Sequence, residues 1–306
     1  MLMLVLNRIG ALQLLVLAGD SRQLGPLVPS DQSGRDPLGK LLSTSILQRL
    51  ADGWPQLAQV KLVKNYRGHP DTSAMANEIF YKGEMESVLP ASHWDTPLTR
   101  NVSSLVQTLS PALPPRSRTP TQNDRVFFFD VKTRSSKEDT GSSTYNGGGI
   151  QATIPLVKLL AGLGVKWNEI GVISMYREDL RLLIVNLKIN GIRNIETKKH
   201  DQRDGLRVAS VDSFQGQQRP TMIVHFVSAR KTGHDPFGLV KNALRLNVAS
   251  TRSQAYQFFV GNMTLWQEWK KSISSCNEST TAMINVMKWL LNWGKVDAVT
   301  GDGTVV

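Results

Sequence analysis

Short apolar runs alternate along this chain with segments in which apolar residues recur every three or four positions. Such runs are typical of buried strands, and such segments are typical of amphipathic helices. The predicted strands cover residues 14–17, 60–63, 126–130, 170–174, 208–211, 222–227 and 257–260. The predicted helices cover residues 38–50, 71–79, 151–163, 177–189 and 239–249. This alternation predicts an α/β fold, a parallel sheet flanked by helices.

Three stretches depart from the alternation. Residues 86–124 combine many prolines with Ser, Thr and Asn, so we expect a long surface insertion that is partly disordered. Residues 135–149 are polar, end in three glycines and are expected to form a loop. The tail, residues 272–306, carries apolar and Trp residues at helical spacing and is predicted to add a packing helix.

Composition and charge narrow the class of protein. The 306 residues, of which 41% are hydrophobic, are enough to bury one substantial core. The net charge of +11 favours polyanionic partners such as nucleic acid, although solubility alone also accounts for such a charge. The single cysteine, Cys276, suits a reducing compartment.

No run is long enough to span a bilayer, and the first apolar stretch ends in Gly19-Asp20 rather than at a cleavage site. We therefore expect no membrane association and a cytoplasmic or nuclear location.

Four polar constellations follow apolar elements, and each is weak by itself. In residues 19–26, a Gly/Pro turn, Gln23 offers a donor and an acceptor that can orient water against a terminal phosphate. In residues 65–70, Arg67 can place a guanidinium on a phosphate while Tyr66 places a ring on a base. The plain alternatives are an ordinary turn and an ordinary surface arginine.

The other two constellations are residues 210–217 and residues 246–252, the second of which ends in Arg252. Because α/β sheets place ligand sites at the C-terminal ends of their strands, we expect all four constellations there. We also expect Arg67 and Arg252 to emerge together at the C-terminal edge of one parallel sheet. They are far apart in sequence, so only the fold can bring them together.

The order of the constellations resembles that of the superfamily 1 helicases, most closely the branch of the nonsense-mediated-decay helicase and the senataxin-like enzymes. The matching segments are motif III (residues 19–26), motif IV (66–83), the strand that follows it (170–176), motif V (208–216) and motif VI (247–252, continued by 260–262). The resemblance runs from about Leu15 to Asn262 and is broken by the insertion.

This resemblance implies a two-lobed motor in which ATP and Mg²⁺ bind between two RecA-like domains that grip single-stranded RNA or DNA. By this resemblance, Gln23 would sense the γ-phosphate, and Arg67 and Arg252 would be arginine fingers. The residues that would bind the nucleotide are Asp20, Tyr66, Gly216 and Gln218. Ser210 would contact the nucleic-acid backbone. Arginine fingers stabilise the charge that develops during phosphoryl transfer. The implied domains are a C-terminal remnant of the first RecA-like domain (residues 1–58), a second RecA-like domain (59–271, with the insertion at 86–124) and the tail (272–306).

The chain departs from the family pattern in several places. Neither the Walker A run G-x-x-x-x-G-K-[ST] nor the acidic motif II that would hold Mg²⁺ occurs, and residues 34–40 have the wrong spacing for a Walker A loop. Gln218 occupies the position of a ribose-binding Glu in motif V. Asp179 replaces a Gln that usually follows the strand ending near Tyr176, and Ser253-Gln254 replaces a small and a basic residue after motif VI. These changes indicate a diverged copy.

Two hypotheses follow. In the first, the chain is the C-terminal part of an ATP-dependent helicase whose first RecA-like domain, its missing partner, lies in a longer protein. In the second, it is a short protein that binds nucleic acid or another protein without hydrolysing ATP. The first is favoured, and an in-frame Walker A segment encoded upstream of Met1 would support it. In both, the isolated chain is expected to be inactive as an ATPase, because the lysine and carboxylate that hold most of the nucleotide are missing.

Overall fold

The structure is a computed structural model that describes residues 15–26, 28, 39, 42–54, 56, 59–96, 99–102, 125–137, 143–192, 194–195, 205–227, 237–271, 278–292 and 295–299. The chain divides into two compact units, Met1–Lys61 and Leu62–Val306. We call them unit 1 and unit 2 and describe each by itself. The domain limits given above, with a first boundary at residues 58/59, stay a prediction.

Among the described residues of unit 1, one helix has defined bounds. Helix α3 (Ile46–Gly53) begins after Ser45, whose Oγ accepts a hydrogen bond from the Gln48 backbone N–H at 3.1 Å. Residues 42 and 43 are also helical, but the chain leaves the helix at Thr44 and Ser45, so the predicted helix 38–50 is interrupted. Residues 15–20 have no regular structure, and the strand predicted at 14–17 is therefore wrong for residues 15–17, while Leu14 lies outside the described residues.

Unit 1 leaves apolar side chains uncovered. None of the residues of α3 is buried. Large apolar side chains that are exposed in this unit are Leu15, Val16, Leu42, Trp54 and Val60. A helix of this length is marginal by itself in water.

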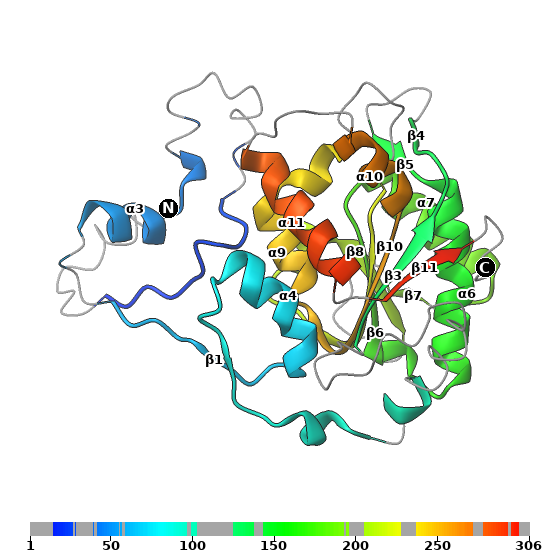
Figure 1. The fold of residues 1–306 in the computed structure, drawn as a ribbon, viewed down its shortest axis with the longest axis horizontal. Helices are drawn as coiled ribbons and strands as arrows, with labels where there is room; N and C mark the ends of the chain where they lie inside the picture. The colour runs from blue at the N-terminus through cyan, green and yellow to red at the C-terminus, as the bar shows by residue number, and fades with distance from the viewer. Residues whose placement is uncertain are drawn as a thin grey trace. The chain divides into compact units, whose positions relative to one another are not determined.

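Unit 2 is built on a seven-stranded parallel sheet with the strand order β11-β3-β10-β9-β6-β8-β7 (Figure 1). The strands are β3 (Val126–Val131), β6 (Ile170–Ser174), β7 (Asn194–Ile195), β8 (Leu206–Ser210), β9 (Arg219–His225), β10 (Ser253–Gly261) and β11 (Lys295–Val299). Strands β3 and β6 are buried along their whole length, because helices cover both faces of the sheet. The predicted fold class is confirmed.

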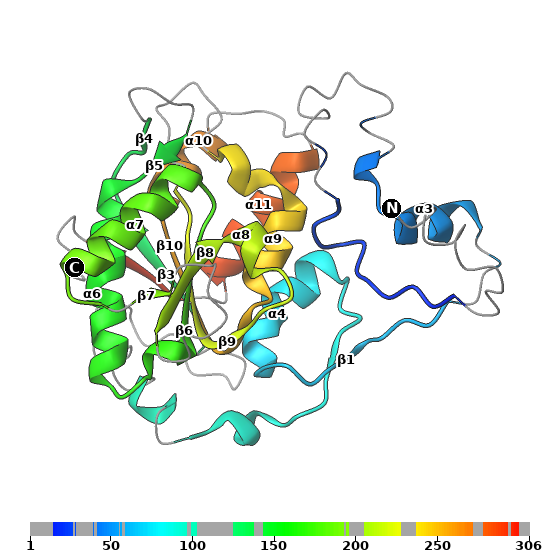
Figure 2. The ribbon, with the colours of Figure 1, turned by 180° about the vertical axis from the view of Figure 1, so that it is seen from behind.

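Helices lie on both faces of this sheet. In Figures 1 and 2, α6 and α7 lie on one face, and α4, α9 and α11 lie on the other. The helices are α4 (Pro70–Phe80), α6 (Gly147–Gly162), α7 (Arg177–Ile189), α8 (Val211–Phe214), α9 (Ala243–Ser250), α10 (Met263–Lys271) and α11 (Glu278–Asn292), with short 3₁₀ turns η2 (Ala91–Trp94), η3 (Trp167–Glu169) and η4 (Gly238–Lys241). Two small ladders complete the unit, a parallel pair of β1 (Lys64–Asn65) with β2 (Glu86–Ser87) and an antiparallel pair of β4 (Ser136–Lys137) with β5 (Thr144–Tyr145).

Aromatic side chains fill the core on both faces of the sheet. Phe127 of β3 stacks on Phe258 of β10 with ring centroids 5.2 Å apart, as the register of the two strands requires. On the opposite face, Phe226 stacks on Phe259 at 5.2 Å, and Trp266 of α10 lies 5.7 Å from Phe226. Successive residues of a strand point to opposite faces of the sheet. Phe258 therefore packs on one face and Phe259 on the other. Each such ring contributes about 1.5–3 kcal/mol through burial.

The polar loop predicted at residues 135–149 ends earlier than expected. Gly147, Gly148 and Gly149 form the first turn of α6, and the Asn146 side chain caps the helix by accepting a hydrogen bond from the Gly149 N–H at 3.1 Å. Glycine is a poor helix former, which explains the error. Its use here is steric, because a Cβ added at Gly148 would lie 2.3 Å from a side-chain atom of Thr133.

The insertion and the tail differ in part from the predictions. Residues 86–102 are not simply a surface loop, because β2 forms there, the Tyr256 hydroxyl donates to the Thr99 carbonyl, and Val102 lies in the core with 1% exposure. The predicted disorder of residues 103–124 falls outside the described residues. The tail forms the expected helix, α11, and then adds an edge strand, β11, that was not predicted.

Candidate functional site

The segments assigned to motif IV and motif VI lie in direct contact. The Arg67 Nη1 donates a hydrogen bond to the Thr251 carbonyl at 3.1 Å, and the His69 backbone N–H donates to the Gln254 carbonyl at 2.7 Å. Gly68 permits this approach, since a Cβ there would lie 2.9 Å from the Gln254 carbonyl oxygen. Arg67 is thereby held against Thr251, the residue that precedes Arg252.

A second connection joins the helices that carry these motifs. The Asn247 Nδ2 in α9 donates to the hydroxyl of Tyr81, which follows α4, at 3.0 Å. Asn77 of α4 in turn holds the following loop, because its side chain accepts from the Met85 N–H at 2.8 Å and donates to the Met85 carbonyl at 2.9 Å. Tyr81 and Asn247 thus join the segments assigned to motif IV and motif VI, while Asn77 orders the loop that follows α4.

The two arginines have different surroundings. Arg67 is exposed, whereas Arg252 is 1% exposed. The Arg252 guanidinium donates from Nε to the Val248 carbonyl at 2.9 Å, from Nη2 to the Thr251 Oγ1 at 2.8 Å and from Nη1 to the Gln217 carbonyl at 3.5 Å. Arg252 therefore ties the end of α9 to the motif V loop, while Arg67 presents its cation to solvent.

The edge of the sheet at which they meet is not the predicted one. Arg252 directly precedes β10, and the N–H of Arg219, the first residue of β9, donates to the Arg252 carbonyl at 3.1 Å. Since the strands are parallel, this is their N-terminal edge, and the expected C-terminal edge was wrong. The reason is that motif VI spans the end of a crossover helix, which returns the chain to the edge where the next strand begins. Arg67 follows β1, which belongs to the separate two-stranded ladder.

Motif V spans the sheet from one edge to the other. Ser210 ends β8 at the C-terminal edge and caps α8, with its Oγ accepting from the Ser213 N–H at 3.3 Å. Gly216 has a φ of +79° that glycine adopts without strain, and Gln218 is exposed beside the start of β9. Gly216 and Gln218 thus lie near Arg252, whereas Ser210 lies at the opposite edge. Tyr66 lies next to Arg67, and its side chain is exposed.

Asp20 and Gln23 form a local turn within unit 1. The Asp20 carboxylate accepts from the Arg22 N–H at 2.9 Å and from the Gln23 Nε2 at 3.0 Å, and the Gln23 N–H donates to the Asp20 carbonyl at 3.1 Å. This turn holds the Gln23 amide against the Asp20 carboxylate.

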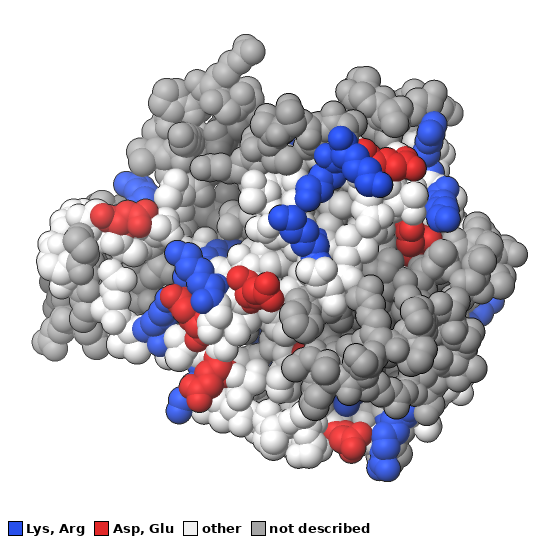
Figure 3. All heavy atoms as spheres, viewed as in Figure 1, with Lys and Arg blue, Asp and Glu red and all other residues white. Residues whose placement is uncertain are grey.

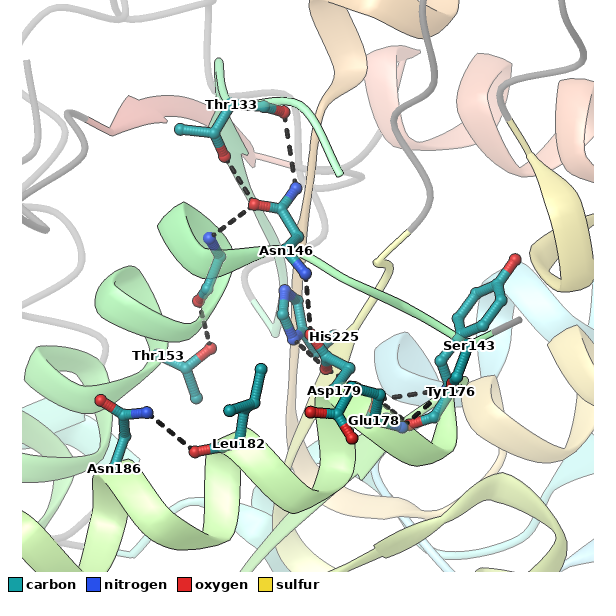
Figure 4. A network of polar contacts seen from close by, with 12 residues as sticks. Thr133, Ser143, Asn146, Thr153, Tyr176, Glu178, Asp179, Leu182, Asn186 and His225 are labelled. Carbon is teal, nitrogen blue, oxygen red and sulfur yellow. Dashed lines mark hydrogen bonds and ion pairs between the residues drawn. The ribbon is translucent and has the colours of Figure 1, made fainter. Parts of the chain in front are cut away.

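A buried polar network occupies the C-terminal edge of the sheet (Figure 4). Asp179, in the first turn of α7, accepts from the Asn146 N–H at 3.0 Å and from the Ser174 Oγ at 2.8 Å, and its Oδ2 lies 2.7 Å from the His225 Nδ1. The side chains of Asp179 and His225 are both 0% exposed. The network joins the ends of β6 and β9 to the starts of α6 and α7, and it gives the replacement of the family's Gln by Asp179 a structural account.

The described residues offer little for a metal ion. Within them, no group of three or more His, Cys, Asp or Glu side chains is arranged to hold one. Across the same residues, no helix is both long enough and apolar enough to cross a bilayer.

Basic and acidic side chains are interspersed on the face shown in Figure 3, so the net charge is not gathered into one patch there.

His69 is a buried titratable group at the junction of the two motifs. It is 5% exposed, and its Nδ1 accepts a hydrogen bond from the Asp71 N–H at 3.1 Å at the start of α4. Burial, followed by the positive charge of Arg125, lowers the pKa of His69 from 6.5 to about 4, against an opposing effect of Asp95. The folded protein therefore needs His69 neutral.

We expect His69 to make folding stability fall as the pH falls from 6.5 towards 4. Between pH 6.5 and pH 4, His69 binds a proton in the unfolded chain but not in the folded chain. The free energy of unfolding that is present above pH 6.5 therefore falls over this window, by at most about 3 kcal/mol. Denaturant unfolding at several pH values would measure the loss. In His69→Asn, whose amide oxygen retains a cap, the loss should be smaller by that amount. An unchanged pH dependence in this variant would show that His69 does not carry the effect.

Comparison with known proteins shows the family of the chain. The profile of the AAA domain family matches residues 42–264. "Putative helicase mov-10-B.1" of Danio rerio is 31% identical over 266 residues, which cover 81% of this chain and 24% of that protein. "Putative helicase MOV-10" of Gallus gallus is 29% identical over 292 residues, covering 86% of this chain and 28% of that protein. "Regulator of nonsense transcripts 1" of Dictyostelium discoideum is 28% identical over 249 residues, covering 81% of this chain and 16% of that protein.

The chain thus spans about a quarter or less of the length of most of these relatives. Among solved structures, the C-terminal domain of a possible DNA helicase from Lactobacillus plantarum matches 55% of this chain and 85% of its own, with a TM-score of 0.31 and 10% identity. The family profile covers well over half of the chain, and the motifs it includes are those joined in unit 2. The chain belongs to the AAA domain family and, within it, to the superfamily 1 helicases of the nonsense-mediated-decay branch, whose C-terminal region it matches.

Proposed function

We propose that this chain is the part of an ATP-dependent helicase that completes the ATP site with Arg67 and Arg252 and binds single-stranded RNA or DNA. The observation that carries the proposal is the junction of motifs IV and VI, where Arg67 donates to the carbonyl of Thr251, the residue next to Arg252. Nothing local in the sequence would bring these arginines together. A site in which both arginines bind one polyanionic ligand would account for their positions.

The groups at the junction fit the polyphosphate of ATP. The exposed guanidinium of Arg67 would pair with phosphate oxygens, and the exposed ring of Tyr66 would stack on the base. Gly216 and Gln218 would border the sugar. Arg252 would have to turn part of its guanidinium outward, and Nη1 is the atom that can do so most easily, because its bond to Gln217 is the longest of the three at 3.5 Å. When ATP is bound it supplies the phosphoryl group, and Mg²⁺ would need ligands from elsewhere.

The proposed partner is the rest of the first RecA-like domain. The curated relatives are several times longer than this chain. Unit 1 exposes Leu15, Val16 and Trp54, and none of the residues of α3 is buried. Apolar surface of this kind is what a missing half of a domain would cover. Such a motor would work in the cytoplasm or the nucleus.

We expect this chain to bind single-stranded oligonucleotides weakly and with strong salt dependence. The reason is the net charge of +11 together with a motif V that resembles a nucleic-acid contact. Each phosphate neutralised should contribute about −0.7 to the slope of log K against log salt concentration. Fluorescence anisotropy with labelled oligo-U and oligo-dT over a range of NaCl concentrations measures this slope and the preference between RNA and DNA. Absence of binding at low salt would contradict the nucleic-acid part of the proposal.

The second candidate is a relative that binds nucleic acid or protein without hydrolysing ATP. The inward-facing guanidinium of Arg252, with 1% exposure, favours it. The replacement of the motif V Glu by Gln218 favours it as well, because an amide holds a ribose hydroxyl without charge. Supplying the first RecA-like domain distinguishes the two. Nucleic-acid-stimulated ATP turnover in the completed motor supports the helicase, and its absence supports the binding protein.

A further inference from the structure

Helix α4 lies against α9 and is bonded to the motif VI segment at both of its ends (Figure 1). Before the helix, the Arg67 Nη1 donates to the Thr251 carbonyl at 3.1 Å. After the helix, the Tyr81 hydroxyl accepts a hydrogen bond from the Asn247 Nδ2 at 3.0 Å. The first of these bonds belongs to the candidate site, whereas Tyr81 was not among the candidate site residues. The second bond therefore has no role yet in the proposed function.

The backbone at Tyr81 is held by the end of α4. Its N–H donates to the carbonyls of Ala76 and Asn77 at 3.2 Å each. The chain turns away directly afterwards, since Lys82 and Gly83 have positive φ values of 56° and 77°. The side chain of Tyr81 thus connects two well-defined backbone segments, the end of α4 and the middle of α9.

The backbone of Asn247 contacts Thr251, one turn further along. The Asn247 carbonyl accepts from the Thr251 Oγ1 at 2.7 Å, and the Arg252 Nη2 donates to the same Oγ1 at 2.8 Å. Asn247 is 0% exposed, and hydrogen bonds that follow one another in a buried region strengthen one another. An unbroken series of hydrogen bonds and covalent bonds therefore leads from Tyr81 to both arginines of the junction.

We propose that Tyr81 is a positioning residue, which holds Arg67 against motif VI in the geometry that phosphoryl transfer needs. The inference rests on the proposed function, because it takes Arg67 to act on the phosphates of ATP. A small displacement of a catalytic group can lower a rate by about 10²-fold, so a bond that fixes α4 relative to α9 is enough to matter. Loss of the Tyr81 hydroxyl should therefore lower kcat more than it changes the KM for ATP.

The first test needs no ATP and uses the 306-residue chain itself. Tyr81→Phe keeps the ring and removes one oxygen. The reporter is the His69 N–H, which donates to the Gln254 carbonyl at 2.7 Å and becomes free to exchange when the junction opens. Hydrogen exchange followed by NMR should be about tenfold faster at this N–H in Tyr81→Phe, relative to the amides of β9.

Tyr176→Phe is the matched control for this measurement. The Tyr176 hydroxyl also accepts a hydrogen bond from a nitrogen, the Leu239 N–H at 2.8 Å, but Tyr176 follows β6 at the other edge of the sheet. Its loss should leave the exchange of His69 relative to β9 unchanged. Equal effects of the two variants at His69, or no effect of Tyr81→Phe, would overturn the proposal.

Turnover in the completed motor tests what the connection does for the reaction. Tyr81→Phe should lower kcat about tenfold and leave the KM for ATP within about twofold. In an Arg67→Ala background the same change should lower kcat no further, because the group that Tyr81 positions is gone. If the two effects multiply instead, Tyr81 acts independently of Arg67 and the proposal is overturned.

The same turnover data separate the inference from the function on which it rests. A kcat near that of the wild type in Arg67→Ala overturns the proposed role of Arg67 and, with it, the role of Tyr81. A loss of kcat in Arg67→Ala without one in Tyr81→Phe overturns the role of Tyr81 alone. A loss in both, without a further loss in the double variant, supports Tyr81 as a positioning residue.

Discussion

Arg67→Ala should lower kcat for ATP hydrolysis by about 10³-fold or more in a motor that includes the first RecA-like domain. An arginine finger acts mainly on the charge that develops in the transition state, so the loss falls on kcat. Arg67 is exposed, and the hydrogen bond described for its side chain goes to the Thr251 carbonyl. Its removal should therefore change the free energy of unfolding by no more than about 0.5 kcal/mol.

Arg252→Ala should lower kcat similarly but also weaken the fold. Its guanidinium is buried and donates to Val248, Thr251 and Gln217. Removing it leaves buried acceptors without partners, which costs about 3 kcal/mol. The effect of Arg252 on turnover is therefore interpretable only beside an unfolding curve, whereas Arg67 gives the cleaner measurement.

Steady-state ATP turnover with saturating single strand measures both effects. The motor can be a longer version of this protein or a chimaera with the first domain of a relative. Arg181→Ala removes a surface arginine far from the junction in the sequence and serves as the control. Nucleic-acid affinity without nucleotide should barely change in Arg67→Ala. A kcat within a few-fold of wild type in Arg67→Ala would remove this residue from the ATP site.

The parallel sheet was predictable because its strands are covered on both faces. Segments such as β3 and β6 then show continuous apolar runs, which differ from the helical periodicity between them. The same reasoning failed in unit 1. Leu15 and Val16 have the composition of a buried strand, yet they are exposed, because a strand needs neighbours that apolar composition cannot supply.

The sequence suggests residues for the candidate site, but it did not give their place in the fold. The sequence of motif VI singles out Arg252 as a candidate. The position of Arg252 at the start of β10, however, depends on where the crossover helix ends. His225 was missed for a related reason. It becomes a neighbour of Ser174 only through the pairing of β9 with β6, and its contact with Asp179 depends on that pairing. The replacement at Asp179 was visible in the sequence, but its partner was not.

The close fit around His225 leads to a large expected effect at Gly149. A Cβ on Gly149 would lie 2.0 Å from the His225 Nε2, far inside contact distance. The ring cannot move away easily, because it is 0% exposed and its Nδ1 lies 2.7 Å from Asp179 (Figure 4). Alanine favours a helix over glycine by about 1 kcal/mol, but overpacking a buried site costs about 1–3 kcal/mol or more. At this separation the clash should outweigh the propensity.

We therefore expect Gly149→Ala to destabilise the fold by about 3 kcal/mol, while Gly147→Ala, one half-turn earlier in α6, should be neutral or slightly stabilising. Gly147 is the matched control because a Cβ there would meet nothing within 4 Å. A double-mutant cycle with His225→Ala tests the cause, since Gly149→Ala should cost nothing once the imidazole is gone. Denaturant unfolding of the four proteins gives the coupling energy. If Gly149→Ala were as stable as Gly147→Ala, or as costly with His225 replaced as with it present, the contact between α6 and β9 would not be what holds glycine at this position.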